Sequence, residues 1–273
     1  MPYLRVDSAN REDATTPMSV FQPLFSAELR DNWKAFLSIN GLAGHSSTLD
    51  KAMIFGANDM ILALPLLLLL AWFALARWSP YSRWLTTRFG AQVAERDRWL
   101  GQRALLTSFI GVGLALALNI LLGALIFEPR PFISHPTLVH KLIAHAADAS
   151  FPSDHEAVSM AIALALTVYF IWLLMRFARE RADGGQRRNA NLEPPRSAWL
   201  GRMAPALVFA ALALIFCVYI GFARVFVGVH YPVDIAGGAV CGAVGDALAF
   251  GLLPLAQRIY QPIVRLAGTL RLA

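Results

Sequence analysis

The segment ASFPSDHEAVSM, residues 149–160, leads into a run of apolar residues that continues to Met175. An aspartate and a histidine, Asp154 and His155, stand at the start of this run. Ionisable side chains at the edge of membrane hydrocarbon are costly, and within a span they usually serve a function. The segment therefore predicts a membrane-crossing helix with a functional site at its first turn. It also requires partners for Asp154 and His155 elsewhere in the chain.

Four other stretches are similarly apolar. Hydrophobic residues make up 57% of the 273 residues and charged residues 15%, whereas a soluble domain carries about 25% charged residues. Each apolar run has close to the roughly 20 residues that cross a bilayer as a helix. We therefore expect an all-α integral membrane protein, a bundle of five transmembrane spans. The five runs cover residues 53–76, 104–127, 157–175, 204–223 and 235–255.

Arginines concentrated in two loops give the expected orientation. Six lie between the first and second spans, and seven lie between the third and fourth. Because positive loops stay in the cytoplasm, both loops are expected inside, and residues 128–156 and 224–234 outside. The net charge of +6 then reflects membrane topology, and we expect no nucleic-acid partner.

The chain is expected to contain one folded membrane domain, residues 51–256, between a polar N-terminal extension, residues 1–50, and a basic cytoplasmic tail, residues 257–273. Within the extension, residues 21–40 place apolar side chains on one helical face, typical of a helix at the membrane interface or one packed on the protein. Glycines in the fifth span, beginning at Gly238, predict close helix packing within the bundle or between two chains, which leaves a homodimer open.

Three short segments are expected on the outer face: EPRPF (128–132), FPSDH (151–155) and ARVFVGVHYPVD (223–234). Arg130 and Arg224 stand at helix ends, and guanidinium groups match the geometry of phosphate oxygens. Ser153 is placed to cap the third span, where free N–H groups and the helix dipole also favour an anion. A phosphate group is therefore the expected ligand.

The histidines in these segments predict cleavage of a phosphate ester. His230 and Asp234 are four residues apart, so the acid can accept from one ring nitrogen and leave the other free to attack phosphorus. His155, from a different helix, can protonate the departing oxygen.

His135, His140 and His145 recur at intervals of five, which does not match helical metal-ligand spacing, and we expect neither a metal nor a cofactor. Asn119, in the second span, is expected to bond between helices.

These segments resemble the signature of the type-2 phosphatidic acid phosphatase superfamily, which reads Lys-x6-Arg-Pro, Pro-Ser-Gly-His and Ser-Arg-x5-His-x3-Asp. The resemblance covers about residues 34–255. The finer text of HAADASFPSDH (145–155) and GVHYPVDIAGG (228–238) is most similar to bacterial undecaprenyl-diphosphate phosphatases. The three motifs stand in this chain as GALIFEPRP (123–131), PSDH (152–155) and ARVFVGVHYPVD (223–234).

The resemblance implies a metal-free reaction in which His230 forms a phosphohistidine, Asp234 orients it and His155 serves the leaving group. The phosphate would be held by Arg130, Ser153 and Arg224.

Three positions depart from the family pattern. Gly123 stands at the family's lysine, Ala223 at its serine and Asp154 at its glycine. A carboxylate would repel a diphosphate, so we expect Asp154 to point away and cap local N–H groups. We hypothesise that Lys141, in the same outer loop, supplies the lost positive charge and joins the substrate-binding residues.

The implied function is hydrolysis of undecaprenyl diphosphate to undecaprenyl phosphate and inorganic phosphate. It would take place at the outer face of a bacterial cytoplasmic (inner) membrane, where it recycles the lipid carrier of peptidoglycan synthesis, and bacitracin resistance on overexpression is expected of the family. Two alternatives stay open: a phosphatase of another lipid phosphate (phosphatidylglycerophosphate, phosphatidate or lipid A), or a non-catalytic transporter or scaffold.

Overall fold

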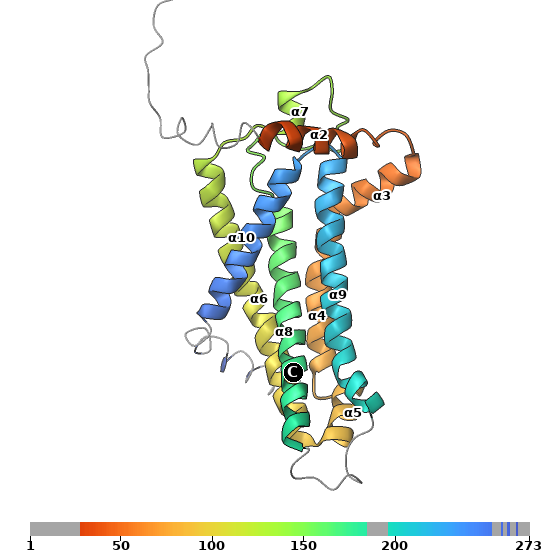
Figure 1. Ribbon diagram of the computed structural model, residues 1–273, viewed down its shortest axis with the longest axis vertical. Coiled ribbons are helices and arrows are strands. Elements are labelled where there is room, and N and C mark those ends of the chain that lie inside the picture. The colour runs from red at the N-terminus through yellow and green to blue at the C-terminus, as the bar shows by residue number, and fades with distance from the viewer. Residues whose placement is uncertain (1–27, 185–195, 253–257, 259–260, 263–265, 267–273) are drawn as a thin grey trace, which may run out of the picture.

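The computed structural model describes residues 28–184 and 196–252, with positions 258, 261, 262 and 266 (Figure 1). This part of the chain is helical and contains no β-strand, only an isolated bridge between Pro129 and Ala149. The elements are α2 (Glu28–Asn40), α3 (Ser47–Asn58), η2 (Met60–Leu62), α4 (Ala63–Leu75), α5 (Pro80–Phe89), α6 (Ala91–Leu125), α7 (Pro131–Ser134), α8 (Asp154–Gly184), α9 (Arg196–Phe226) and α10 (Pro232–Gly251).

Four helices, α6, α8, α9 and α10, are each long and apolar enough to cross a membrane. Helix α3, followed by η2 and α4, is long and apolar enough to be a fifth span if the two parts, which meet at a 48° bend, are counted as one. The expected all-α, multi-pass membrane fold is confirmed, but the first span is not one straight helix from residue 53 to residue 76. The polar pair Asn58 and Asp59 interrupts it, and α3 turns sideways from the end of the bundle (Figure 1).

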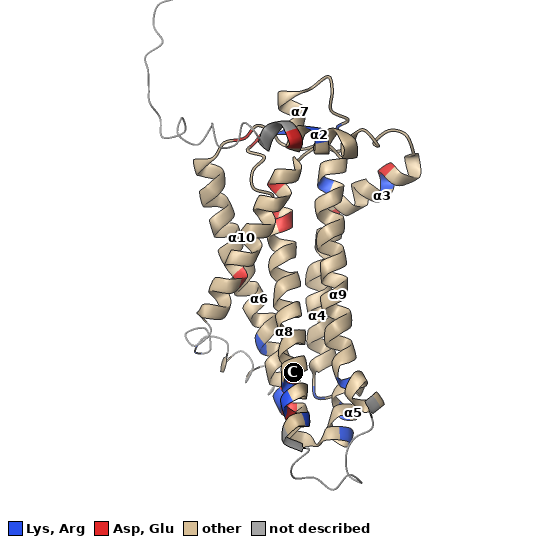
Figure 2. Cartoon of the chain, viewed as in Figure 1, with Lys and Arg blue, Asp and Glu red and all other residues tan. Residues whose placement is uncertain are grey.

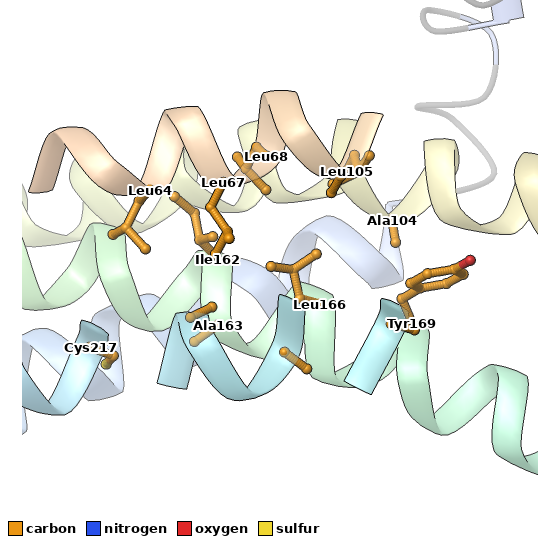
Figure 3. Close-up of a cluster of buried hydrophobic side chains, with 14 of the residues drawn as sticks. Leu64, Leu67, Leu68, Ala104, Leu105, Ile162, Ala163, Leu166, Tyr169 and Cys217 are labelled. Carbon is orange, nitrogen blue, oxygen red and sulfur yellow. The ribbon is translucent and has the colours of Figure 1, made fainter. Parts of the chain in front are cut away.

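Helix α8 lies at the centre of the bundle and packs against α6, α9 and α10. The main core cluster is made of apolar side chains from α4, α6, α8 and α9, including Leu67, Ile162, Leu166 and Cys217 (Figure 3). Because lipid is as apolar as these side chains, close packing rather than exclusion of water holds such helices together.

The glycines of α10 let it approach its neighbours closely. A Cβ atom on Gly242 would lie 2.6 Å from the Ala157 carbonyl oxygen of α8, and one on Gly245 would lie 2.6 Å from the Ala115 nitrogen of α6. The small-residue face of α10 therefore packs against helices of its own chain. Of the two expected alternatives, packing within one bundle or between two chains, the structure shows the first.

The two ends of the bundle differ in charge. Arginines gather around α5 and the end of α8 (Figure 2), at the end opposite α2 and α7. There the buried Arg202 of α9 bonds through Nε to Oδ2 of Asp97 on α6 (2.6 Å) and through NH1 to Oε2 of Glu180 on α8 (2.6 Å). This ion network joins three spans at the end that the arginine pattern predicts to be cytoplasmic.

Helix α2 lies across the other end of the bundle, beside α7 (Figure 1). Phe36 is fully buried, and Trp33 stacks on it and contacts the His135 ring in a tilted arrangement. Asn40 donates from Nδ2 to the carbonyls of His140 (2.9 Å) and Phe226 (2.8 Å) and accepts from the His140 N–H (2.9 Å). The described part of this helix therefore packs on the protein and connects the loop between α7 and α8, which is predicted to lie outside, to the end of α9.

The predicted domain limits at residues 50 and 256 stay predictions. Residues 1–27 lie outside the described part, as does most of the predicted tail, and α3 already begins at Ser47.

Candidate active site

The pair formed by His230 and Asp234 lies where the chain enters α10. Asp234 is in the first turn of this helix, and its Oδ2 accepts from the Tyr231 N–H (2.7 Å) and from the Ser150 hydroxyl (2.5 Å). His230 Nδ1 lies 3.3 Å from the same oxygen. Both side chains are buried. The helix start thus fixes the carboxylate, and the carboxylate orients the imidazole.

The other ring nitrogen, His230 Nε2, faces two guanidinium groups. It lies 3.2 Å from NH1 of Arg130 and 3.2 Å from NH2 of Arg224. Guanidinium nitrogens only donate, so Nε2 must hold a lone pair and Nδ1 must carry the proton that faces Asp234. Burial, opposed by Asp234 and reinforced by Arg224, lowers the pKa of His230 to about 4. The imidazole is therefore neutral near pH 7, with the lone pair of Nε2 between two positive charges.

The two arginines reach this point from different elements. Arg130 precedes α7, and its NH1 also donates to the Val229 carbonyl (2.9 Å). Arg224 is in the last turn of α9, and its NH1 donates to the Ala57 carbonyl of α3 (3.3 Å). Arg130 is 5% exposed and Arg224 is 3% exposed. Two buried guanidiniums on one nitrogen form a site suited to the oxygens of a phosphate group.

Two residues at the start of α8 complete the cradle. Ser153 is fully buried, its N–H donates to the Asp234 carbonyl (3.0 Å), and its hydroxyl has no hydrogen-bond partner among the described residues. An unpaired buried hydroxyl is costly, so this group is available for a ligand. His155 is half-buried and lies within electrostatic range of His230 and Arg224.

Asp154 is turned toward α6. Its Oδ1 accepts from Nδ2 of Asn119 at 2.5 Å, and the same nitrogen donates to the Pro152 carbonyl at 3.0 Å. The expected interhelical hydrogen bond of Asn119 is confirmed. Asp154 pairs with this side chain rather than with the local N–H groups we expected it to cap.

The outer loop contributes residues that the sequence did not single out for the site. His145 Nε2 lies 3.0 Å from NH2 of Arg224, and Oδ1 of Asp148 accepts from Nε of Arg130 (2.7 Å). The hydrogen bond and charge of Arg130 outweigh the effect of burial, which alone would raise the pKa, and hold the pKa of Asp148 below its ordinary value. The segment HAADASFPSDH contains both residues. Because loop residues have no periodic spacing, the sequence could not predict that His145 and Asp148 contact the two arginines.

Lys141 lies at the border of this group. Its Nζ is 3.6 Å from the centre of the Phe132 ring and donates to the His145 carbonyl (3.3 Å). The three loop histidines do not gather: the His135 ring contacts Trp33, and the backbone of His140 bonds to Asn40. The substrate-binding role of Lys141 stays a prediction.

Glu128, directly before the Pro-Arg-Pro turn, is a further residue that the sequence analysis missed. Burial raises the pKa of Glu128 to about 8, and the negative charge of Asp234 and a hydrogen bond with Asp234 act in the same direction. At pH 7 it is therefore a neutral acid beside the carboxylate that orients His230.

Comparison with known proteins identifies the family of this chain. The family model described as PAP2 superfamily matches residues 104–258, a range that contains Arg130, His155, Arg224, His230 and Asp234. Undecaprenyl-diphosphatase BcrC of Bacillus subtilis is 31% identical over 86% of this chain and 91% of its own length. Putative undecaprenyl-diphosphatase YbjG of Escherichia coli is 27% identical over 78% of each chain.

A third relative, named bacitracin transport permease protein BcrC, from Bacillus licheniformis, is 26% identical over 84% of each chain. The family model covers more than half of the chain, and the first relative is matched along nearly its whole length. This chain therefore belongs to the PAP2 superfamily and is a multi-pass membrane phosphatase of that family.

Proposed function

We propose that the protein removes the terminal phosphate of undecaprenyl diphosphate through a phosphohistidine on His230. The observation that carries this proposal is the setting of His230. Its Nδ1 faces Asp234 at 3.3 Å, and its Nε2 lies 3.2 Å from each of two buried arginines. A neutral imidazole with a backing carboxylate and a lone pair inside a cationic cradle is the arrangement that nucleophilic attack on phosphorus requires.

In the proposed reaction, Arg130, Arg224 and the Ser153 hydroxyl hold the oxygens of the terminal phosphoryl group. His230 Nε2 forms a bond to phosphorus while the bond to the bridging oxygen breaks, and the electron pair stays on that oxygen. His155 gives it a proton, so undecaprenyl phosphate leaves. The phosphohistidine carries a positive charge because Nδ1 keeps its proton, and Asp234 stabilises that charge.

Water completes the cycle in the second step. His155, now without the proton, accepts one from a water molecule as its oxygen bonds to phosphorus. The nitrogen–phosphorus bond breaks and its electrons return to Nε2, which restores the resting enzyme and releases inorganic phosphate. All groups in this account belong to the chain, and the arginines supply the charge stabilisation.

We place the reaction at the outer face of a bacterial cytoplasmic membrane. The candidate site lies at the end of the bundle near α2 and α7, whereas the arginine-rich end is opposite (Figure 2). Positive-inside topology then puts the site in the periplasm or at the cell exterior. A diphosphate lipid dephosphorylated there would be returned as the monophosphate carrier of cell-wall synthesis, as the names of two relatives suggest.

Another lipid phosphate is the main alternative, since the cradle is built for a phosphate and the spans offer only generic apolar surface to a lipid tail. A transporter is the second alternative, raised by the name of the third relative. Binding alone would need Arg130 and Arg224, but it would not need a histidine backed by a buried acid. The pair of His230 and Asp234 therefore favours catalysis.

Phosphate release by detergent-purified protein tests the proposal. Undecaprenyl diphosphate, phosphatidate and phosphatidylglycerophosphate are compared in excess EDTA. We expect preference for the polyprenyl diphosphate with EDTA present, and loss of release in His230→Ala. Preference for a glycerolipid would keep the mechanism and change the substrate. If no phosphate is released from any of the lipids, the result favours a transporter or scaffold over an enzyme.

A further inference from the structure

The outer loop that carries His145 is held firmly against the bundle. Asn40 binds the backbone of His140 on both its N–H and its carbonyl, and the Leu142 N–H donates to the Val227 carbonyl (3.2 Å). Ile143 is buried in the same cluster as Val227. The position of His145 is therefore set by fixed contacts on its N-terminal side.

The His145 ring lies against Arg224. Its Nε2 is 3.0 Å from NH2, the same arginine nitrogen that lies 3.2 Å from His230 Nε2. Because a guanidinium nitrogen only donates, His145 Nε2 must accept, and its proton is on Nδ1. That nitrogen lies 3.2 Å from the Ala146 carbonyl and 3.8 Å from Oδ1 of Asp148. Burial and then the charge of Arg130 lower the pKa of His145, which agrees with a neutral ring.

Asp148 makes the matching contact on the other arginine. Its Oδ1 accepts from Nε of Arg130 at 2.7 Å. His145 and Asp148 therefore form one brace from the outer loop, with one member on each guanidinium.

The brace reduces the electrostatic repulsion between the two arginines. Arg130 and Arg224 both approach His230 Nε2 to 3.2 Å, so two like charges are held close together in a buried place. Like charges at such separation repel, and burial strengthens the repulsion. A carboxylate on one guanidinium and a neutral acceptor on the other oppose this repulsion while no phosphate is bound.

We propose that His145 is a positioning residue: it holds the Arg224 guanidinium, as Asp148 holds that of Arg130, in the orientation that receives the substrate phosphate. The inference rests on the proposed function in that a phosphate group is the ligand of the two arginines. It does not depend on which lipid carries that group.

Two substitutions separate this role from a merely structural one. Gln offers a carbonyl oxygen near the place of Nε2 and can accept from Arg224, whereas Leu has similar bulk and cannot accept. We expect His145→Leu to raise KM about 10-fold to 100-fold with a smaller change in kcat, because misplacing a binding group costs factors of this order. His145→Gln should stay close to wild type.

The matched control is His140→Leu, on the same loop. The His140 ring is exposed, and its contacts with Asn40 are through the backbone, so kinetics should not change. A second check uses Arg224→Ala: if His145 acts through Arg224, adding His145→Leu to this variant changes KM no further.

The proposal is overturned if His145→Leu leaves KM at the wild-type value, if His145→Gln loses as much as His145→Leu, or if the His145→Leu effect persists in full without Arg224. Failure of the proposed function is recognised separately, because wild-type protein would then hydrolyse no lipid phosphate. In that case calorimetric binding of inorganic phosphate decides the point: binding weakened in His145→Leu but not in His145→Gln supports the brace, and equal binding in all three overturns it.

Discussion

At the scale of single residues, the site depends on how each nitrogen of His230 is occupied. The spacing of His230 and Asp234 allowed their pairing to be expected, and in the structure Asp234 is in the first turn of α10 while His230 directly precedes the N-cap residue. That the two arginines near Nε2 bind phosphate was expected from phosphate chemistry, and this role stays a prediction. Ser150, Glu128 and His145 could not be predicted in this way, since their positions are set by loops that pack against distant segments.

The neutral state of Glu128 gives a pH prediction. Its pKa of about 8 means that it is protonated below that pH and ionised above it, where a second negative charge would stand beside Asp234. We expect wild-type kcat/KM to fall as the pH rises above about 8. Glu128→Gln, which stays neutral, should lose this alkaline decline.

The measurement is the pH dependence of phosphate release for wild type and Glu128→Gln side by side on one substrate, so that ionisation of the substrate affects both equally. An alkaline decline of the same size and midpoint in both proteins would show that Glu128 is not its source.

At the scale of elements, hydropathy was enough to locate the apolar segments that could cross a membrane, but not to find the bend between α3 and α4. The apolar run hides it, because two polar residues, Asn58 and Asp59, change the average over a 20-residue window very little. The sequence also could not predict where α2 packs on the bundle. The hydrogen bonds of Asn40 join residues 100 and 186 positions away, and no local pattern encodes such partners.

The packing of α10 on α8 predicts different outcomes for two Gly→Ala substitutions. A Cβ on Gly242 would meet the Ala157 carbonyl oxygen at 2.6 Å, whereas a Cβ on Gly113 of α6 would meet nothing within 4 Å. We expect Gly242→Ala to destabilise the protein by about 1–3 kcal/mol through overpacking. Gly113→Ala should be neutral or stabilise by up to about 1 kcal/mol, because alanine favours the helix.

Thermal unfolding midpoints in the same detergent measure this difference. Equal midpoints for the two variants would mean that α10 does not pack as closely on α8 as described.

The hydrogen bonds of Asn40 on α2 predict that Asn40→Ala lowers both stability and activity, although Asn40 is not part of the site. The substitution leaves the Phe226 carbonyl and both backbone groups of His140 without their partner, at a cost of about 1–3 kcal/mol for each buried group left unpaired. Both the unfolding midpoint and kcat/KM should fall, since the loop bearing His145 and the end of α9 bearing Arg224 lose one of the contacts that connect them.

Ser38→Ala is the control for this substitution. Ser38 is exposed on the same helix and bonds only locally, to the Ala35 carbonyl, so its removal should change neither quantity. If Asn40→Ala behaved like Ser38→Ala in both measurements, α2 would have no part in holding the site.

At the scale of the whole molecule, the two ends of the bundle have different tasks. One end is joined by the ion network of Arg202, Asp97 and Glu180, and the other carries the residues around His230. The arginine pattern of the sequence predicts that the end with the ion network faces the cytoplasm, and this orientation stays a prediction. The pairs within the network were not predictable, because Asp97 and Glu180 belong to helices whose relative rotation only the folded bundle defines.

The central claim is that His230 carries the phosphoryl group. Its most direct test is rapid mixing of the protein with undecaprenyl diphosphate radiolabelled in the terminal phosphate, followed by denaturation in alkali, in which phosphohistidine survives. We predict protein-bound label that is lost on acid treatment, that appears before phosphate release reaches its steady rate, and that is absent in His230→Ala. Steady phosphate release from the wild type without bound label, together with release retained by His230→Ala, would contradict the account.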